Sequence, residues 1–273
     1  MIIDGRHIAL EVVDALAKER ERLPAVVRLG VVMAEGDAAT ESFVRIKERV
    51  ASRLSVELVR EILPHGATTD DAIAAVHRLA QTTGGVIVQL PLPKDMDTDA
   101  VLRAIPATHD VDVVSRPQPK GPGESSDLSG LRAPVAEAIS EIFARAGVSV
   151  RARESVVVGA GRLVGVPAAQ LLADLGAHVS VVTLSDGSLD SLREADIVIL
   201  GAGRSCMVQP HMLKKGVVLI DAGTSEQGGR VMGDAAPECA EVASVFTPVP
   251  GGVGPIAVAM IFKNLFSLIK RAG

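Results

Sequence analysis

The chain has 273 residues, more than the roughly 100 to 200 of one typical domain, so we expect two domains. Hydrophobic residues make up 48% of it and aromatic residues only 2%, so the core must be aliphatic, as in α/β proteins built on parallel strands. The net charge of -5, the lack of a basic cluster and the scarcity of aromatic rings argue against nucleic acid as a partner.

The cysteines and histidines show no pattern of a disulfide framework or a metal site. Cys206 and Cys239 fit no CxxC spacing, and the six histidines form no paired ligand motif. Early charged residues argue against a signal peptide, and prolines and glycines interrupt the apolar stretch 242–262 that would otherwise resemble a membrane span. We therefore expect a cytoplasmic protein with no bound metal and no membrane partner.

The first predicted elements are a helix over residues 8–16, a strand over 29–33 and, after the loop 34–40, a second helix. The second helix has an apolar stripe formed by Phe43, Ile46, Val50 and Leu54. Lys47 follows Phe43 by four residues and therefore lies on the same face. Either its stem packs while its amine reaches water, or the amine serves catalysis in a cleft. The pattern leaves both interpretations open.

A third helix begins at a cap formed by residues 69–71 and precedes a buried strand over 85–90. The polar residue of that strand, Gln89, lies at its carboxyl end, where open α/β sheets bind ligands. Backbone groups of the neighbouring loop would satisfy the same amide equally well. A short helix over 101–105 follows, and the strand-like segment 110–113 then presents two carboxylates before the Pro- and Gly-rich loop 116–130.

Residues 155–184 read as a strand, a glycine turn, a helix and a second strand. The strand 155–158 runs into Gly159, Gly161 and Gly165, and the turn places backbone N–H groups at a helix N-terminus. This geometry is typical of pyrophosphate binding, although the spacing GxGxxxG also suits a tight turn without a ligand. A helix over 134–147 precedes this unit, and two strands over 195–200 and 216–220 follow it, the latter two ending in small residues suited to line a cofactor cleft.

Five segments together resemble the bifunctional methylenetetrahydrofolate dehydrogenase/cyclohydrolase family. They are 39–47 (ATESFVRIK), 85–93 (GVIVQLPLP), 110–112 (DVD), the glycine turn with 164–167 (VGVP), and 247–255 (TPVPGGVGP). They occur in order along nearly the whole chain, and the last is long and rich in proline and glycine. The resemblance implies an α/β, two-domain fold with a folate-binding catalytic domain, residues 1–132 plus the C-terminal helix 256–273, and a Rossmann-like nicotinamide domain, residues 133–255.

The resemblance also implies the activity and its residues. The enzyme would oxidise methylenetetrahydrofolate to the methenyl form with NADP, or with NAD, and hydrolyse that product to formyltetrahydrofolate, as a cytoplasmic homodimer in the one-carbon metabolism that supplies purine biosynthesis. In the family the lysine matching Lys47 is the central catalytic residue, the glutamine matching Gln89 contacts it, and the aspartate matching Asp112 binds the pterin ring. The substrate-binding set is Phe43, Pro250, Gly251 and Gly252, and the cofactor-binding set is Gly159, Ala160, Gly161, Arg162 and Thr224.

Several positions depart from the family pattern. Phe43 replaces a tyrosine, Val113 replaces the glycine of DVDG, and Ala160 replaces the arginine of the phosphate turn. The basic residue usual after the second cofactor strand is absent near Asp186, whose carboxylate suits the ribose hydroxyls of NAD. Because Arg162 is the one nearby cation to compensate, we expect a weakened preference for NADP.

Two other functions are compatible with these departures. A degenerate paralogue would act mainly as a cyclohydrolase, or would bind folate or nucleotide without turnover. An unrelated NAD(P)-dependent dehydrogenase would share the glycine turn alone. Activity with folate substrates separates all three.

Overall fold

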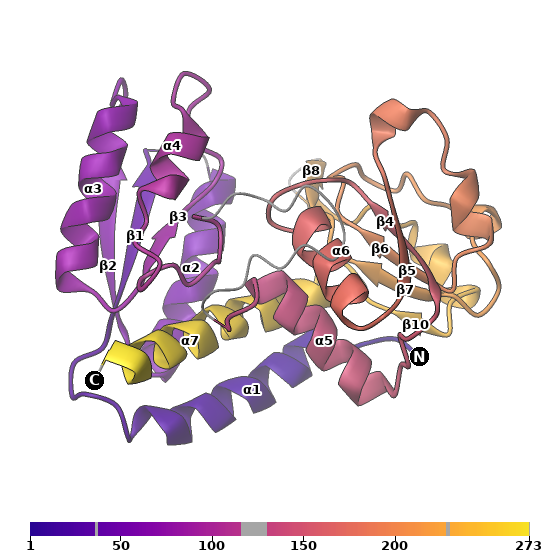
Figure 1. Ribbon diagram of the computed structural model, residues 1–273, viewed down its shortest axis with the longest axis horizontal. Helices are drawn as coiled ribbons and strands as arrows, with labels where there is room; N and C mark the ends of the chain where they lie inside the picture. The colour runs from indigo at the N-terminus through magenta and orange to yellow at the C-terminus, as the bar shows by residue number, and fades with distance from the viewer. Residues whose placement is uncertain (36–37, 116–129, 228–229, 273) are drawn as a thin grey trace. The chain divides into compact units, whose positions relative to one another are not determined.

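The structure is a computed structural model that describes residues 1–35, 38–115, 130–227 and 230–272 (Figure 1). It divides into two compact units, named here for their parallel sheets. The described part of the three-stranded unit comprises residues 10–35, 38–115, 130–134 and 258–272, and that of the five-stranded unit comprises residues 1–9, 135–227 and 230–257.

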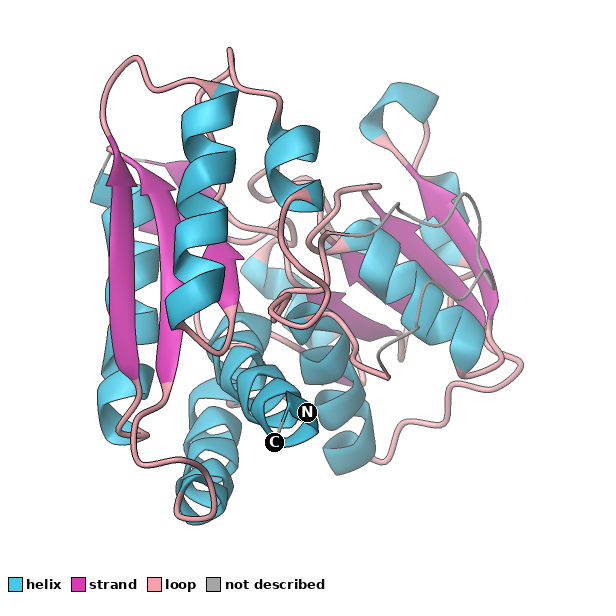
Figure 2. Ribbon diagram, turned by 60° about the vertical axis from the view of Figure 1, so that its left-hand side comes forward, coloured by secondary structure: helices cyan, strands magenta, loops and turns pink. Residues whose placement is uncertain are grey.

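The three-stranded unit has a parallel sheet in the order β2-β1-β3. It is built from α1 (Gly5–Arg20), β1 (Arg28–Ala34), α2 (Ala38–Arg53), β2 (Glu57–Leu63), α3 (Thr69–Thr82), β3 (Val86–Val88), α4 (Thr98–Arg103) and α7 (Val253–Ala272). Helices lie on both faces of the sheet (Figure 2). The first and last of these elements, α1 and α7, contribute residues to both units.

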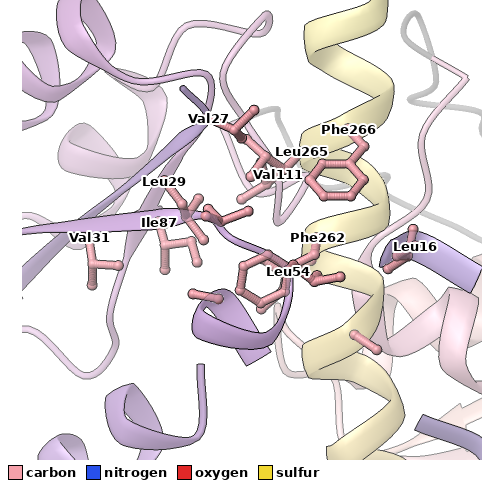
Figure 3. Close-up of a cluster of buried hydrophobic side chains, with 14 of the residues drawn as sticks. Leu16, Val27, Leu29, Val31, Leu54, Ile87, Val111, Phe262, Leu265 and Phe266 are labelled. Atoms are coloured by element: carbon pink, nitrogen blue, oxygen red, sulfur yellow. The ribbon is translucent and has the colours of Figure 1, made fainter. Parts of the chain in front are cut away.

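Alternation along β1 explains why both faces are covered. Leu29, Val31 and Met33 point into one buried cluster, which also holds Phe262 and Phe266 of α7 (Figure 3). Val32 points to the opposite face, where buried residues of α3 and α4 complete a second cluster. Because successive side chains of a strand alternate between faces, this continuous apolar run specifies a central parallel strand.

The five-stranded unit has a parallel sheet in the order β10-β7-β6-β4-β5 and an antiparallel pair β8-β9. Its elements are α5 (Pro134–Ala146), β4 (Glu154–Val158), α6 (Gly165–Asp174), β5 (His178–Val182), β6 (Ile197–Leu200), β7 (Val218–Asp221), β8 (Ser225–Gln227), β9 (Arg230–Met232) and β10 (Val245–Phe246), with 3-10 turns at Leu184–Asp186, Asp190–Arg193, Pro210–Met212 and Pro237–Glu241. From β4 the chain goes to β5 on one side and to β6 on the other. Such a switch point opens a ligand crevice at the carboxyl end of β4.

The predicted α/β, two-domain fold is confirmed, but the N-terminal residues belong to a different unit from the one predicted. The family resemblance predicts residues 1–9 in the folate domain, whereas they group with the five-stranded unit. Ile3 donates a 2.9 Å hydrogen bond to the carbonyl of Phe246, and Phe246 donates one of 2.9 Å to the carbonyl of Met1. Pairing with β10 therefore holds the N-terminus there.

The apolar stripe predicted on α2 is wrong in two of its members. Phe43 is 42% exposed and Ile46 is 40% exposed. The buried face instead carries Val44, Lys47, Ala51 and Leu54. These residues are spaced by three, four and three positions, as residues on one face of a helix are. Lys47 belongs to the buried face in either description.

Two predicted strands are shorter in the structure. The segment 110–113 forms a single bridge, between Val86 and Asp110, and continues as a turn. The second strand of the 155–184 unit, predicted to reach residue 184, ends at Val182, because Thr183 and Asp186 form a capping box that starts a 3-10 turn. Most of the predicted loop 116–130 lies outside the described residues.

Helix α7 is long and apolar enough, by length and composition alone, to cross a membrane. In the structure it is a core helix, because Phe262, Leu265 and Phe266 are completely buried against the three-stranded sheet (Figure 3). Core helices of water-soluble proteins commonly pass the same test.

Candidate active site

A buried lysine–glutamine pair lies at the carboxyl end of β3. The Nζ of Lys47 donates a 2.8 Å hydrogen bond to Oε1 of Gln89, and the lysine is only 8% exposed. The Nε2 of Gln89 donates in turn to the carbonyl of Leu90 at 2.9 Å. The loop backbone thus fixes the orientation of the amide, whose oxygen is left to receive the amine. The Lys47 amine does not escape to water as a snorkelling side chain would.

Charge and burial shift the proton affinities of two groups in this unit. Burial lowers the pKa of Lys47, and the nearby carboxylate of Asp112 opposes this shift. Burial raises the pKa of Asp112 to about 6; Lys47 counteracts the rise and Asp110 adds to it. An amine with a lowered pKa and a carboxyl with a raised one can both exchange protons nearer neutrality than usual.

Asp112 lies on a turn whose shape depends on its neighbours. The Oδ2 of Asp110 accepts a 2.8 Å hydrogen bond from the backbone N–H of Ser115, closing the turn. Val113 has a φ of +58°, in the left-handed region that disfavours β-branched residues. This is the position where the family has glycine, so the sequence departure falls on the residue that most needs glycine's freedom.

The glycine turn after β4 has the geometry of a phosphate cradle. Gly159 has a φ of +100°, and a Cβ there would lie 2.6 Å from the carbonyl oxygen of Gly201. A Cβ on Gly165 would lie 2.0 Å from the carbonyl oxygen of Gly159. At Gly161 the nearest atom would be 3.8 Å away, so packing demands the first and third glycines while the second leaves room for a ligand.

The turn also offers hydrogen-bond donors. Within the described chain, the backbone N–H groups of Ala160 and Gly161 donate to no backbone carbonyl. Val164, the N-cap of α6, makes no side-chain hydrogen bond to the first turn of the helix. Arg162, which follows Gly161 in the same turn, is partly buried. These residues fit a nucleotide pyrophosphate, which accepts from such N–H groups.

A neighbouring loop, residues 202–204, is held by the buried carboxylate of Asp234. Its Oδ2 accepts from the N–H groups of Ala202 at 2.7 Å and Gly203 at 3.1 Å, and its Oδ1 accepts from that of Arg204 at 2.7 Å. The carbonyl of Thr224, an exposed residue following β7, lies beside Gly203. The loop after β6 therefore adjoins the glycine turn after β4, and the loop after β7 adjoins the loop after β6.

The carboxylate of Asp186 caps its own turn through one oxygen, Oδ2. Its carboxylate accepts from the N–H of Thr183 at 2.5 Å and from the hydroxyl of Thr183 at 3.0 Å. These hydrogen bonds lower the pKa of Asp186, which therefore stays ionised as the cap of its own turn. The absence of a basic residue here is real, but the carboxylate already has a local role.

The loop carrying Pro250, Gly251 and Gly252 belongs to the five-stranded unit. Gly251 has a φ of +110°, and Gly252 donates a 2.7 Å hydrogen bond to the carbonyl of Pro248. The structure therefore divides the predicted site residues between the units. Phe43, Lys47, Gln89 and Asp112 share the three-stranded unit, and all other predicted site residues lie in the five-stranded one.

Sequence reasoning missed three buried polar residues that organise these segments, Asp221, Asp234 and Asn264. Each is an isolated polar residue beside or within an apolar run, and that isolation was the available signal. Cys206 and Cys239 are both free thiols. In the part of the chain that the structure describes, no group of three or more His, Cys, Asp or Glu residues is arranged to hold a metal ion.

Comparison with known proteins relates both parts of the chain to one family. Residues 3–112 match the model of the tetrahydrofolate dehydrogenase/cyclohydrolase catalytic domain. Residues 133–273 match the model of the NAD(P)-binding domain of the same family. This second match includes α7, although residues 258–272 pack within the three-stranded unit.

Relatives match over their full length. The bifunctional protein FolD of Halothermothrix orenii is 36% identical over 100% of this chain and 99% of its own, and that of Pelotomaculum thermopropionicum is 34% identical over 100% and 98%. The solved FolD structure from Campylobacter jejuni has a TM-score of 0.90 at 25% identity, covering 100% of this chain and 99% of that one. A Trypanosoma brucei enzyme solved with NADP and an inhibitor has a TM-score of 0.88 at 29% identity, covering 100% and 98%. The chain belongs to the tetrahydrofolate dehydrogenase/cyclohydrolase family.

Proposed function

We propose that this protein oxidises methylenetetrahydrofolate to methenyltetrahydrofolate and hydrolyses the product to formyltetrahydrofolate. The observation that carries the proposal is the buried hydrogen bond between Lys47 and Gln89, in a chain whose two parts both match this family. Such a match does not favour the alternative of an unrelated dehydrogenase. The structure retains the polar groups that a turnover-deficient paralogue would be free to lose.

Lys47 is proposed as the proton-transfer group. Burial lowers its pKa, so a fraction of the amine is neutral nearer physiological pH than for an ordinary lysine. A neutral amine can accept the proton that a water molecule loses when it adds to the methenyl carbon. Gln89 accepts from the amine and fixes its position, which keeps its lone pair directed at one place.

Asp112 and Phe43 are proposed to hold the folate. An ionised Asp112 accepts hydrogen bonds from the donor-rich edge of a pterin. Phe43 lies one helical turn before Lys47 with its ring exposed, so it is available to stack on an aromatic substrate. It lacks the hydroxyl of the family's tyrosine. Pro250, Gly251 and Gly252 are proposed to complete substrate binding.

NADP is the proposed cofactor, and it supplies a nicotinamide that accepts the hydride. Gly159, Ala160 and Gly161 offer the phosphate cradle described above, and Thr224 lies after the neighbouring strand β7. Arg162 is the proposed cation for the adenosine phosphate, since Ala160 and Asp186 cannot bind it. We further propose a cytoplasmic homodimer that contributes to purine biosynthesis and has neither nucleic acid nor a membrane as a partner.

Assays of both half-reactions with both nucleotides test the proposed function. We expect NADP reduction with methylenetetrahydrofolate, slower reduction of NAD, and hydrolysis of methenyltetrahydrofolate without any nucleotide. Folate binding without either reaction would instead identify a degenerate paralogue, and neither binding nor turnover would refute the proposal. Replacing Arg162→Ala tests the cofactor assignment, because the Kd for NADP should rise about tenfold while that for NAD changes little.

A further inference from the structure

Asn264 is a polar residue at the centre of the apolar helix α7. It is only 2% exposed, and the adjacent residue Leu265 and nearby Phe262 and Phe266 are completely buried. An amide in such surroundings is costly unless its hydrogen bonds are made. Asn264 must therefore find partners away from its own helix.

Both N–H bonds of the Asn264 side chain are used. The Nδ2 donates to the carbonyl of Val111 at 2.9 Å and to the carbonyl of Arg132 at 2.9 Å. Arg132 lies just before α5, and Val111 lies between Asp110 and Asp112. One amide thus links α7 to the turn that carries Asp112 and to the chain entering α5.

Val111 and Val114 of the turn are buried, but among the described residues few hydrogen bonds hold its backbone. Asp110 forms a single bridge with Val86 and caps the N–H of Ser115, while its Oδ1 is buried without a partner in the described chain. Val111 packs into the cluster that contains Leu265 of α7 (Figure 3). Val113 holds a left-handed φ that its own side chain disfavours, so contacts from outside the turn must maintain it. The Asn264 amide is such a contact.

We infer that Asn264 is a positioning residue for Asp112, through which α7 sets the place of the folate-binding carboxylate relative to Lys47 and Gln89. The inference rests on the proposed function. It assigns Asn264 no contact with substrate: the amide acts through the carbonyl of Val111 and the turn that follows.

The variant Asn264→Leu keeps the size of the side chain and removes both hydrogen bonds. We expect the KM for methylenetetrahydrofolate to rise at least tenfold while the KM for NADP changes less than twofold. The control is Phe266→Leu, which perturbs the same helix and cluster without touching the carbonyl of Val111, and should change neither KM more than twofold. If Asn264→Leu does not fold, Asn264→Ser removes the same contacts with a smaller side chain and is assayed instead.

A rescue variant separates positioning from simple loss of stability. Val113→Gly lets the turn adopt its left-handed φ without strain, so the turn then depends less on the tether. In the Asn264→Leu background, Val113→Gly should restore at least half of the lost folate affinity, expressed on a logarithmic scale. A role limited to helix packing predicts no rescue, and equal changes in both KM values or unchanged values overturn the inference.

Hydrogen exchange at the turn provides a readout that is independent of activity. Loss of the Asn264 amide should speed exchange in peptides covering residues 111–115, and Phe266→Leu should not do so. A wild type with neither turnover nor folate binding refutes the proposed function. The hydrogen exchange of residues 111–115 still tests the positioning role in that case. Unchanged exchange in Asn264→Leu would refute that role.

Discussion

The Nζ of Lys47 and the Oε1 of Gln89 lie 2.8 Å apart, although 42 positions separate the two residues in the chain. The amine comes from the buried face of α2, and the amide from the carboxyl end of β3. Replacing Lys47→Met retains the stem and removes the amine. We expect methenyltetrahydrofolate hydrolysis to fall about 10²- to 10⁴-fold, the range of general acid–base catalysis, with folding intact.

Circular dichroism and thermal denaturation would establish the folded state of that variant. Lys18→Met, an exposed lysine on α1 in the same unit, is the matched control and should retain full activity. Turnover of Lys47→Met at the wild-type rate would return Lys47 to a purely structural role.

The exposed ring of Phe43 predicts a gain of activity. Phe43→Tyr returns the hydroxyl found in the family, and because the ring is 42% exposed the polar atom need not be buried. One additional hydrogen bond to a bound substrate or water is worth about 1 kcal/mol, so we expect roughly a fivefold rise in kcat/KM for hydrolysis. Steady-state rates and melting temperatures of both forms would test this. Equal rates would mean that the site functions without the hydroxyl.

Asp112 should govern the acid limb of the pH profile. Its pKa is raised to about 6, so it loses its charge as pH falls through that value. If the ionised form binds the pterin, kcat/KM for folate falls about tenfold per pH unit below 6. Asp112→Asn should have a lower kcat/KM at neutral pH and no such limb. An unchanged limb in the variant would assign it to another group.

The raised pKa of Asp112 also predicts that stability changes with pH in the opposite direction to activity. The folded state binds the Asp112 proton more tightly than the unfolded state, whose ordinary pKa is 3.8. This contribution to the free energy of unfolding therefore declines as pH rises from about 4 to about 6. Denaturant titrations at pH 4.5 and 7 should show Asp112→Asn gaining on the wild type at the higher pH, and a constant difference would contradict the shift.

Replacing Asp234 should weaken NADP binding without changing the rate of methenyltetrahydrofolate hydrolysis. Asp234→Asn places an N–H donor where the carboxylate accepts from the backbone of residues 202–204. Hydrogen bonds to a charged group contribute about 1.5 to 3 kcal/mol each, so we expect the KM for NADP to rise at least tenfold. Hydrolysis should change less than twofold. Asp174→Asn, an exposed aspartate at the end of α6, is the control.

The strain at Val113 predicts an inverted ranking of two substitutions. At an ordinary position alanine is more favourable than glycine, but at a φ of +58° glycine avoids a steric cost of about 1 to 2 kcal/mol. Val113→Gly should therefore be about 1 kcal/mol more stable than Val113→Ala. Both variants lose the isopropyl group, so that loss cancels in the comparison. Urea denaturation of the pair would reveal the sign.

The features predicted from sequence were those that local patterns determine. The apolar run of β4 and the glycine turn after it follow from strand and turn chemistry, and the structure confirms their order. The charge of Lys47 on an apolar helix face was visible for the same reason. Its bond to Gln89 could only be suggested by the family resemblance, because no local rule pairs residues of different elements.

Other features escaped because they depend on distant contacts. The role of Asn264 could not be predicted, since its partners lie in loops far earlier in the chain. Phe43 and Ile46 were misplaced because hydrophobicity alone cannot show which part of a helix surface faces the sheet. Asp186 looked suited to a ribose, but its Oδ2 caps a turn by accepting from the N–H and the hydroxyl of Thr183.

The distance along the chain between Val111 and Asn264 has a consequence for the newly made protein. These residues are separated by 153 positions, so at about 5 to 20 residues per second the ribosome delivers the asparagine many seconds after its acceptor. During that interval residues 135–257 emerge as one uninterrupted segment and can fold. The three-stranded unit must wait for Phe262, Leu265 and Phe266 before its core closes. A prematurely terminated chain therefore retains the glycine turn after β4 without a finished lysine site, and only translation through α7 yields an active enzyme.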